Sequence, residues 1–138
     1  MQLEFIQSMI NTKTPKEKRH VLVVDDDREI AETLRCALSK EGYDVSVATD
    51  GNQGLAYVEA TNPDLIILDM MMPRRSGFLV LERLLQVSEA SAPVIMITGN
   101  QGSRHQEYAE MLGVNDYLHK PFTIERLLDS VGKLLVSK

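Results

Sequence analysis

Three short apolar runs, each ending in a polar residue, constrain the fold of this chain more than any other feature. They cover residues 21–24, 65–68 and 94–97, and they are followed directly by Asp25, Asp69 and Thr98. An unbroken apolar run of this length, rich in β-branched residues, is typical of a strand buried on both faces, and such strands occur in parallel sheets. The sequence therefore predicts three central strands of a parallel sheet.

The segments between these runs complete an alternating pattern. Residues 44–48 alternate between polar and apolar side chains, and residues 116–120 are interpreted in the same way, which predicts two edge strands. Apolar residues at helical spacing predict helices around residues 30–38, 51–62, 81–85, 104–112 and 124–135. Asp27 is placed to cap the first helix, and Gly42 and Gly113 are placed to end the first and the fourth.

Strands that alternate with helices predict an α/β fold with a doubly wound, five-stranded parallel sheet and helices on both faces. Right-handed crossovers limit the strand order, and the order 2-1-3-4-5 satisfies the central and edge positions. The length of 138 residues suits one domain, predicted over residues 20–138. Residues 1–19 are predicted to be a tail, either flexible or a short helix with Leu3, Ile6, Met9 and Ile10 on one face.

Composition excludes several classes of function. The excess of 20 acidic over 15 basic residues argues against a dedicated nucleic-acid surface. Apolar runs are too short for a transmembrane helix, and the N-terminus lacks a signal-peptide pattern, so we expect a cytoplasmic protein without membrane contact. Cys36 is the only cysteine, which excludes an intramolecular disulfide and a cysteine-rich metal site.

Polar side chains follow the predicted strands where the strands end. Asp25, Asp26, Asp69, Thr98 and Lys120 should meet, because the carboxyl ends of parallel strands lie at one edge of the sheet. Two carboxylates about 4 Å apart repel each other by about 4 kcal/mol at an effective dielectric constant of 20, so the cluster needs cations. Lys120 supplies one, and a hard divalent ion with oxygen ligands, Mg²⁺ above all, supplies the rest.

A carboxylate beside Mg²⁺ can accept a phosphoryl group covalently. Asp69 is the best acceptor because it ends the middle strand of the predicted order, whereas Asp25 and Asp26 are better placed as metal ligands. Thr98 and Lys120 would contact the phosphoryl oxygens. The alternative, in which each aspartate only caps a helix or begins a turn, suits Asp27 but not the whole set.

These residues lie in four motifs: VLVVDDD (21–27), LIILDMMMP (65–73) with Gly77, VIMITG (94–99) and YLHKPF (117–122). Together, over residues 20–136, the chain resembles the receiver domain of two-component response regulators, which has a flavodoxin-like fold. The resemblance implies that Asp69 is phosphorylated and that Mg²⁺ is bound by Asp25, Asp26, Asp69 and the backbone carbonyl of Met71.

The same resemblance implies a switch and its partners. Thr98 moves towards the phosphoryl group, Lys120 pairs with it, the bond before Pro121 is cis, and the Tyr117 ring turns inward on activation. The alternative for Tyr117 is an ordinary half-buried tyrosine of an edge strand. The implied donor is a sensor histidine kinase, a histidine phosphotransfer protein or a small phosphodonor. A downstream protein would bind the face formed by residues 104–112, 116–120 and 124–135.

Three other functions are alternatives for the same residues. An aspartate-nucleophile phosphatase would need a second aspartate where Met71 stands, and a flavodoxin-like cofactor module would place phosphate against Asp25–Asp27. A receiver fold acting only as a binding module is a further alternative. Receivers that dimerise often carry an arginine in the final helix, around Ser130 of this chain, so the resemblance implies a monomer or weak dimer here. Met71 and Asn100 predict a fairly stable aspartyl phosphate, because methionine cannot position an attacking water.

Overall fold

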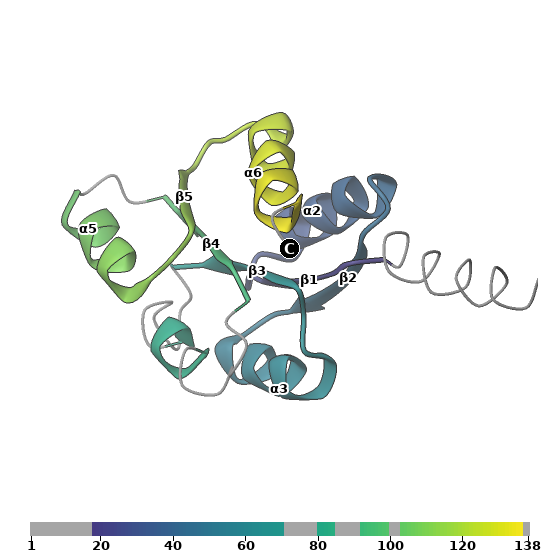
Figure 1. Cartoon of the computed structure of the whole chain (residues 1–138), viewed down its shortest axis with the longest axis horizontal. Helices are drawn as coiled ribbons and strands as arrows, with labels where there is room; N and C mark the ends of the chain where they lie inside the picture. The colour runs from purple at the N-terminus through teal and green to yellow at the C-terminus, as the bar shows by residue number, and fades with distance from the viewer. Residues whose placement is uncertain (1–17, 71–79, 85–91, 100–102, 137–138) are drawn as a thin grey trace, which may run out of the picture.

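The computed structural model describes residues 18–70, 80–84, 92–99 and 103–136, and it contains one five-stranded parallel sheet (Figure 1). The strand order is β2-β1-β3-β4-β5, so the predicted fold class and order are confirmed. The strands are β1 His20–Val24, β2 Asp44–Ala48, β3 Leu65–Asp69, β4 Val94–Thr98 and β5 Asp116–His119. The helices are α2 Arg28–Lys40, α3 Gly51–Thr61, α5 Ser103–Leu112 and α6 Ile124–Val136.

Two apolar layers cover the two faces of this sheet. One layer joins the sheet to α2 and α6, whose buried residues include Leu34, Leu38, Leu127 and Val131. The opposite layer includes Val58 of α3, Ala109 of α5 and the helical residues 80–84. Figure 1 shows α2 and α6 together on one side of the sheet and α3 on the other. The central strands are therefore buried on both faces, as their unbroken apolar runs predict.

Local signals set where the helices begin and end. The Asp27 side chain accepts hydrogen bonds from the backbone N–H groups of Glu29 and Ile30, so it caps α2 as predicted. At the other end, Gly42 has a φ of +96°, which permits bonds from Gly42 N to Ser39 O and from Tyr43 N to Leu38 O. These two bonds form a Schellman motif, which turns the chain into β2.

The end of β5 differs from the prediction in two respects. The strand ends at His119, so Lys120 lies one residue beyond it. Tyr117 and Leu118 point to opposite faces, yet both are buried. Tyr117 packs in the layer that contains Ala109 of α5, and Leu118 packs in the layer that contains Leu127 of α6. An edge strand that is covered on both faces cannot show the half-buried pattern that alternation predicts.

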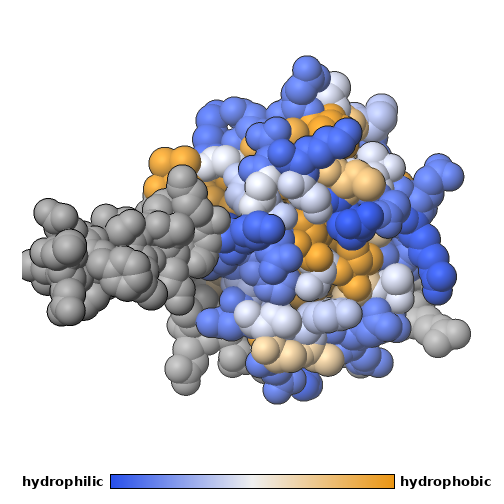
Figure 2. Space-filling model, turned by 90° about the vertical axis from the view of Figure 1, so that its right-hand side faces the viewer, coloured by the Kyte–Doolittle hydropathy of each residue, from blue (hydrophilic) through white to orange (hydrophobic). Residues whose placement is uncertain are grey.

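Some predictions fall on residues that the structure does not describe, namely most of the tail (1–17), Met71, Gly77 and Asn100. The domain boundary at residue 20 therefore stays a prediction. No helix among the described residues combines the length and apolar character needed to cross a membrane. Figure 2 views the molecule from the side on which β2 lies, where apolar surface is framed by hydrophilic side chains.

Candidate functional site

Three carboxylates meet at the carboxyl edge of the sheet. Asp25 follows β1 directly, Asp26 comes next, and Asp69 is the last residue of β3. One oxygen from each of these side chains can be chosen so that all three lie within 4.8 Å of one another. Because β1 and β3 are hydrogen-bonded neighbours with Val24 opposite Leu68, their ends cannot lie apart. The structure therefore brings together the acidic residues that the sequence predicts.

Asp25 is a buried member of this cluster, and its surroundings disfavour the ionised form of its carboxyl group. Its side chain is 1% exposed; Oδ1 accepts a hydrogen bond from Asp27 N at 2.9 Å. Among the described residues, no hydrogen-bond partner exists for the buried Oδ2. Burial raises the pKa of Asp25 to about 7, the Asp27 bond opposes this, and the nearby Asp69 raises it further. A buried acid of this kind needs a positive charge beside it in order to ionise at lower pH.

Lys120 and Thr98 complete the polar end of the sheet. Lys120 Nζ lies 4.0 Å from Asp69 Oδ1, and the lysine side chain is 29% exposed whereas that of Asp69 is 3% exposed. The Lys120 backbone is held by a bond from its N–H to Thr98 O at 2.7 Å. Thr98 ends β4 and is fully buried. The Lys120–Pro121 bond is cis, as the resemblance implies.

Tyr117 lies inside the molecule and close to this edge. Its hydroxyl contacts Met70 Sδ at 3.6 Å, and Met70 directly follows Asp69. Burial raises the pKa of Tyr117, and a hydrogen bond with the Thr98 side chain opposes the rise. The tyrosine is only 7% exposed, so it is more buried than the half-buried residue that was the alternative to a switch. No local pattern in the sequence links Met70 to Tyr117, so only the fold reveals this contact.

The donor set fits a hard divalent cation. It offers only carboxylate oxygens; one of them is buried without a hydrogen-bond partner among the described residues. Such ions take oxygen ligands and retain water molecules, and Asp26 is exposed and leaves a path to solvent. Met71, the fourth predicted ligand, lies outside the described residues.

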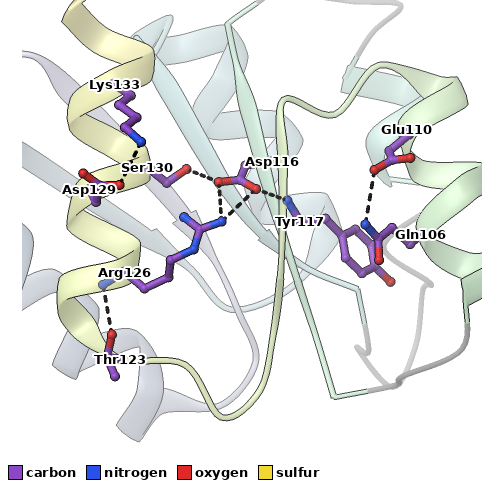
Figure 3. Close-up of polar contacts among 9 residues, drawn as sticks. All are labelled: Gln106, Glu110, Asp116, Tyr117, Thr123, Arg126, Asp129, Ser130 and Lys133. Atoms are coloured by element: carbon purple, nitrogen blue, oxygen red, sulfur yellow. Dashed lines mark hydrogen bonds and ion pairs between the residues drawn. The ribbon is translucent and has the colours of Figure 1, made fainter.

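A second polar cluster, which sequence reasoning did not find, joins β5 to α6 (Figure 3). Asp116 Oδ2 accepts a hydrogen bond from Ser130 Oγ at 2.6 Å and pairs with Arg126 Nη2 at 3.1 Å. Burial tends to raise the pKa of Asp116, but the bonds from Ser130, Tyr117 N and Arg126 outweigh it and lower the pKa. No local pattern links residues 116, 126 and 130, so only the fold reveals this cluster.

Comparison with known proteins agrees with this geometry. The response regulator receiver domain family matches residues 21–132. The response regulator MprA of Mycolicibacterium vanbaalenii is 38% identical over 115 residues, which are 83% of this chain and 49% of that protein. The MprA of Mycobacterium leprae is also 38% identical, over 50% of its length. The chain thus spans about half the length of the curated relatives it matches.

Solved structures show the same architecture. A CheY-like receiver domain protein from Methanospirillum hungatei superposes with a TM-score of 0.82 at 28% identity, covering 87% of this chain and 95% of that one. The receiver domain of the Francisella response regulator 1452 gives 0.81 at 33% identity, covering 88% of this chain and 100% of the other. With the family match and the acidic site on one sheet edge, the chain belongs to the response regulator receiver domain family, whose work is phosphorelay signalling.

Proposed function

We propose that this chain is a phosphorylation-controlled switch whose phosphoryl acceptor is the carboxylate of Asp69. One observation carries the proposal: two other carboxylates and an ammonium group surround this buried side chain. Asp25 and Asp26 lie within 4.8 Å of it, counted between ligand oxygens, and Lys120 Nζ lies 4.0 Å away. No other group of three or more acidic, histidine or cysteine side chains close enough to hold a metal is found among the described residues.

We propose Mg²⁺ as the ion that this site takes, held by Asp25, Asp26 and Asp69 and by the backbone carbonyl of Met71. The buried Asp25 Oδ2, which lacks a hydrogen-bond partner among the described residues, supports a cation beside it. When bound, the ion neutralises charge on the phosphoryl oxygens during transfer. The pairing of β1 with β3 positions the acceptor Asp69, because Val24 lies opposite Leu68 in the parallel ladder.

In the proposed reaction an Asp69 carboxylate oxygen attacks phosphorus. The bond between phosphorus and the donor breaks, and the donor nitrogen of a phosphohistidine, or the donor oxygen of an acyl phosphate, keeps the electron pair. Lys120, already 4.0 Å from Asp69, then pairs with the new phosphoryl oxygens. The hydroxyl of Thr98 supplies a hydrogen-bond donor from the neighbouring strand.

The proposed switch runs from Thr98 to Tyr117. The side chains of Thr98 and Tyr117 share a hydrogen bond. If the Thr98 hydroxyl moves towards the phosphoryl group, this bond breaks or lengthens. Tyr117 and His119 lie edge to face at 5.2 Å, and His119 Nε2 lies 3.4 Å from Gln106 Oε1 of α5. A local charge change at Asp69 is thereby linked by contacts to the face formed by α5, β5 and α6, which we propose as the binding surface for a downstream protein.

The proposed donor is a sensor histidine kinase or a histidine phosphotransfer protein, encountered in the cytoplasm, or a small phosphodonor; membership of the family supports this assignment. We propose a monomer or weak dimer. The charged groups at the junction of β5 and α6 already pair within the chain, since Asp116 is bound by Arg126 and Ser130 (Figure 3). Ser130 is 3% exposed and cannot contact a second copy directly.

Intact mass spectrometry after incubation with acetyl phosphate and Mg²⁺ tests the acceptor. We expect the wild type to gain one phosphoryl group, and the gain to be absent without Mg²⁺. Asp69→Asn should gain nothing, because an amide is not nucleophilic enough to accept the group. Asp129→Asn is the matched control, since that aspartate pairs with Lys133 on the surface of α6 and should leave the gain unchanged.

Two results would contradict the proposal. A phosphoryl gain that persists in Asp69→Asn would place the acceptor elsewhere. If the wild type gains no mass and a beryllofluoride mimic of the phosphoryl group causes no structural shift, the chain has the receiver fold without a working switch. The binding-module alternative would then replace the present proposal.

A further inference from the structure

An apolar groove runs between α2 and α6 on the face opposite α3. Two adjoining depressions form it and share Glu29, Thr33 and Ile124 in their walls. One reaches Lys120, Pro121 and Phe122 beside the acidic site, and the other reaches Lys40 and Glu41 at the end of α2. Its apolar lining consists of Ile30, Leu34, Ala37, Phe122, Ile124 and Leu128.

Three glutamates and two lysines line this α2–α6 groove, and the lysines are Lys40 and Lys120. Glu29, Glu32 and Glu41 line it on the side of α2. Glu32 pairs with Arg35 of the same helix, whereas no ion pair of Glu29 or Glu41 is found within the described part of the chain. Glu29 and Glu41 can therefore pair with basic side chains of an occupant whose apolar face lies in the groove.

The chain enters the domain at one end of this groove. The N–H of Asp44 donates to Arg19 O at 2.9 Å, so Arg19 lies beside the turn that joins α2 to β2. The Tyr43 hydroxyl experiences the charges of both Glu41 and Arg19, which places these two residues near the same side chain. The segment that precedes Arg19 therefore joins the domain near the Glu41 end of the groove.

The sequence of that segment matches the groove in polarity and length. Leu3, Ile6, Met9 and Ile10 fall on one face at helical spacing, and Lys13, Lys16, Lys18 and Arg19 follow them. The eight residues 3–10 would span about 12 Å as a helix, and the 13 residues of α2 span about 20 Å, so the apolar part fits along the groove. The basic part would lie nearest Glu41, where opposite charges attract.

We propose that residues 3–10 of this chain form an amphipathic helix that occupies the α2–α6 groove of the same molecule, with the following basic residues beside Glu41. The far end of the groove is lined by Lys120, so the docked helix stands next to the proposed acceptor site. It hinders the approach of a protein donor more than that of acetyl phosphate. This consequence rests on the proposed phosphorylation of Asp69, but the docking itself does not.

The thiol of Cys36 reports on the groove because it is exposed and lines the wall near Glu32 and Lys40. Its alkylation rate by iodoacetamide would be measured in the full chain, in Ile6→Asp and in Ser8→Asp. Ile6→Asp puts a charge on the apolar face, whereas Ser8→Asp puts the same charge on the opposite face. We expect Ile6→Asp to accelerate alkylation severalfold and Ser8→Asp to leave the wild-type rate unchanged. Methyl NMR signals of Ile124 and Leu128 should shift only in Ile6→Asp.

Each other outcome overturns the proposal. Equal alkylation rates in all three proteins, with unshifted methyl signals, would show that the segment does not cover the groove. Protection of Cys36 that grows with protein concentration would assign the groove to the segment of a second copy. Both readouts work without phosphorylation, so a failure here is separate from a failure of the acceptor test.

Discussion

At the scale of single residues, burial decides what each member of the acidic cluster can do. Asp25 is 1% exposed and Asp26 is exposed, although the two are adjacent in the chain. Asp25 lies just beyond β1, where its N–H donates to Ala48 O, and its desolvated carboxyl holds a proton up to about pH 7. Asp26 remains at the solvent side of the same cluster. Two identical side chains thus receive different roles from the strand geometry alone.

The raised pKa of Asp25 predicts how the stability of the metal-free chain depends on pH. The folded chain binds this proton up to about pH 7, whereas the ordinary pKa is 3.8, so the free energy of unfolding falls as pH rises from about 4 to about 7. Asp25→Asn stays neutral and keeps an acceptor for Asp27 N. The free energy of unfolding, measured with urea, is compared between Asp25→Asn and the wild type. The difference in favour of the variant should be larger at pH 8 than at pH 5.

The control for this prediction is Glu59→Gln, which changes an exposed acid on α3. Its stability relative to the wild type should be the same at both pH values. If Asp25→Asn behaves in the same way, the folded chain does not retain the Asp25 proton, and the assigned burial effect is wrong.

The lifetime of the aspartyl phosphate is a second prediction at this scale. Met71 stands two residues after Asp69 and cannot orient an attacking water by charge or a strong hydrogen bond. We expect slow decay of the phosphorylated mass with Mg²⁺ present, and faster decay in Met71→Asn, whose amide can bind water. A half-life of seconds in the wild type would contradict the expectation.

At the scale of elements, helix ends and glycines set the boundaries that bring the site together. Asp27 and Asp50 cap α2 and α3 within three residues of the ends of β1 and β2, so each helix begins close to the edge that carries the carboxylates. Gly42 reverses the chain at the other end of α2. The helices therefore pack against the faces of the sheet and leave room at the carboxyl ends of the strands for the acidic cluster.

Two glycine substitutions should have opposite effects on stability. Gly42 has a φ of +96°, so Gly42→Ala should cost about 1 kcal/mol or more, although an added Cβ would meet nothing within 4 Å. Gly132 lies inside α6 with open space around its Cβ position, so Gly132→Ala should add about 0.5–1 kcal/mol. Urea unfolding measures both values. Equal shifts of the same sign would refute the conformational argument.

At the scale of the whole molecule, one sheet edge collects groups that lie far apart in the sequence. The parallel order places Asp25, Asp69, Thr98 and Lys120 at the ends of four neighbouring strands. The repulsion among the acids is a cost that the folded chain bears until a cation binds. Binding of the proposed Mg²⁺ would therefore be thermodynamically linked to folding.

Mg²⁺ should raise the thermal stability of the metal-free chain. A ligand that binds only the folded state stabilises it by about 2.7 kcal/mol at 100 times its Kd. Because Asp25 must lose its proton to act as a ligand, binding below about pH 7 should release protons. The affinity for Mg²⁺ should therefore decrease as the pH is lowered. Calorimetry in two buffers of different ionisation enthalpy measures the release. Equal apparent enthalpies at pH 6 would rule it out.

The sequence by itself determined the fold class and most of the acidic site, and it limited the strand order to arrangements that include the observed one. Unbroken apolar runs can be stable only when both faces are covered, so β1, β3 and β4 had to be central. Once these strands are parallel and adjacent, the residues that follow them must share one edge. Asp25, Asp26, Asp69 and Lys120 could therefore be predicted together from their positions at strand ends.

Only the tertiary structure decided which side chains lose contact with water and which pair across elements. The burial of Tyr117 and its contact with Met70 depend on layers contributed by α5 and by residues 80–84. The bonds of Asp116 to Ser130 and Arg126 join a strand to a helix that follows a loop. Periodicity reports which face of one element is apolar, but solvent exposure and pairing are set by what a second element places against that face.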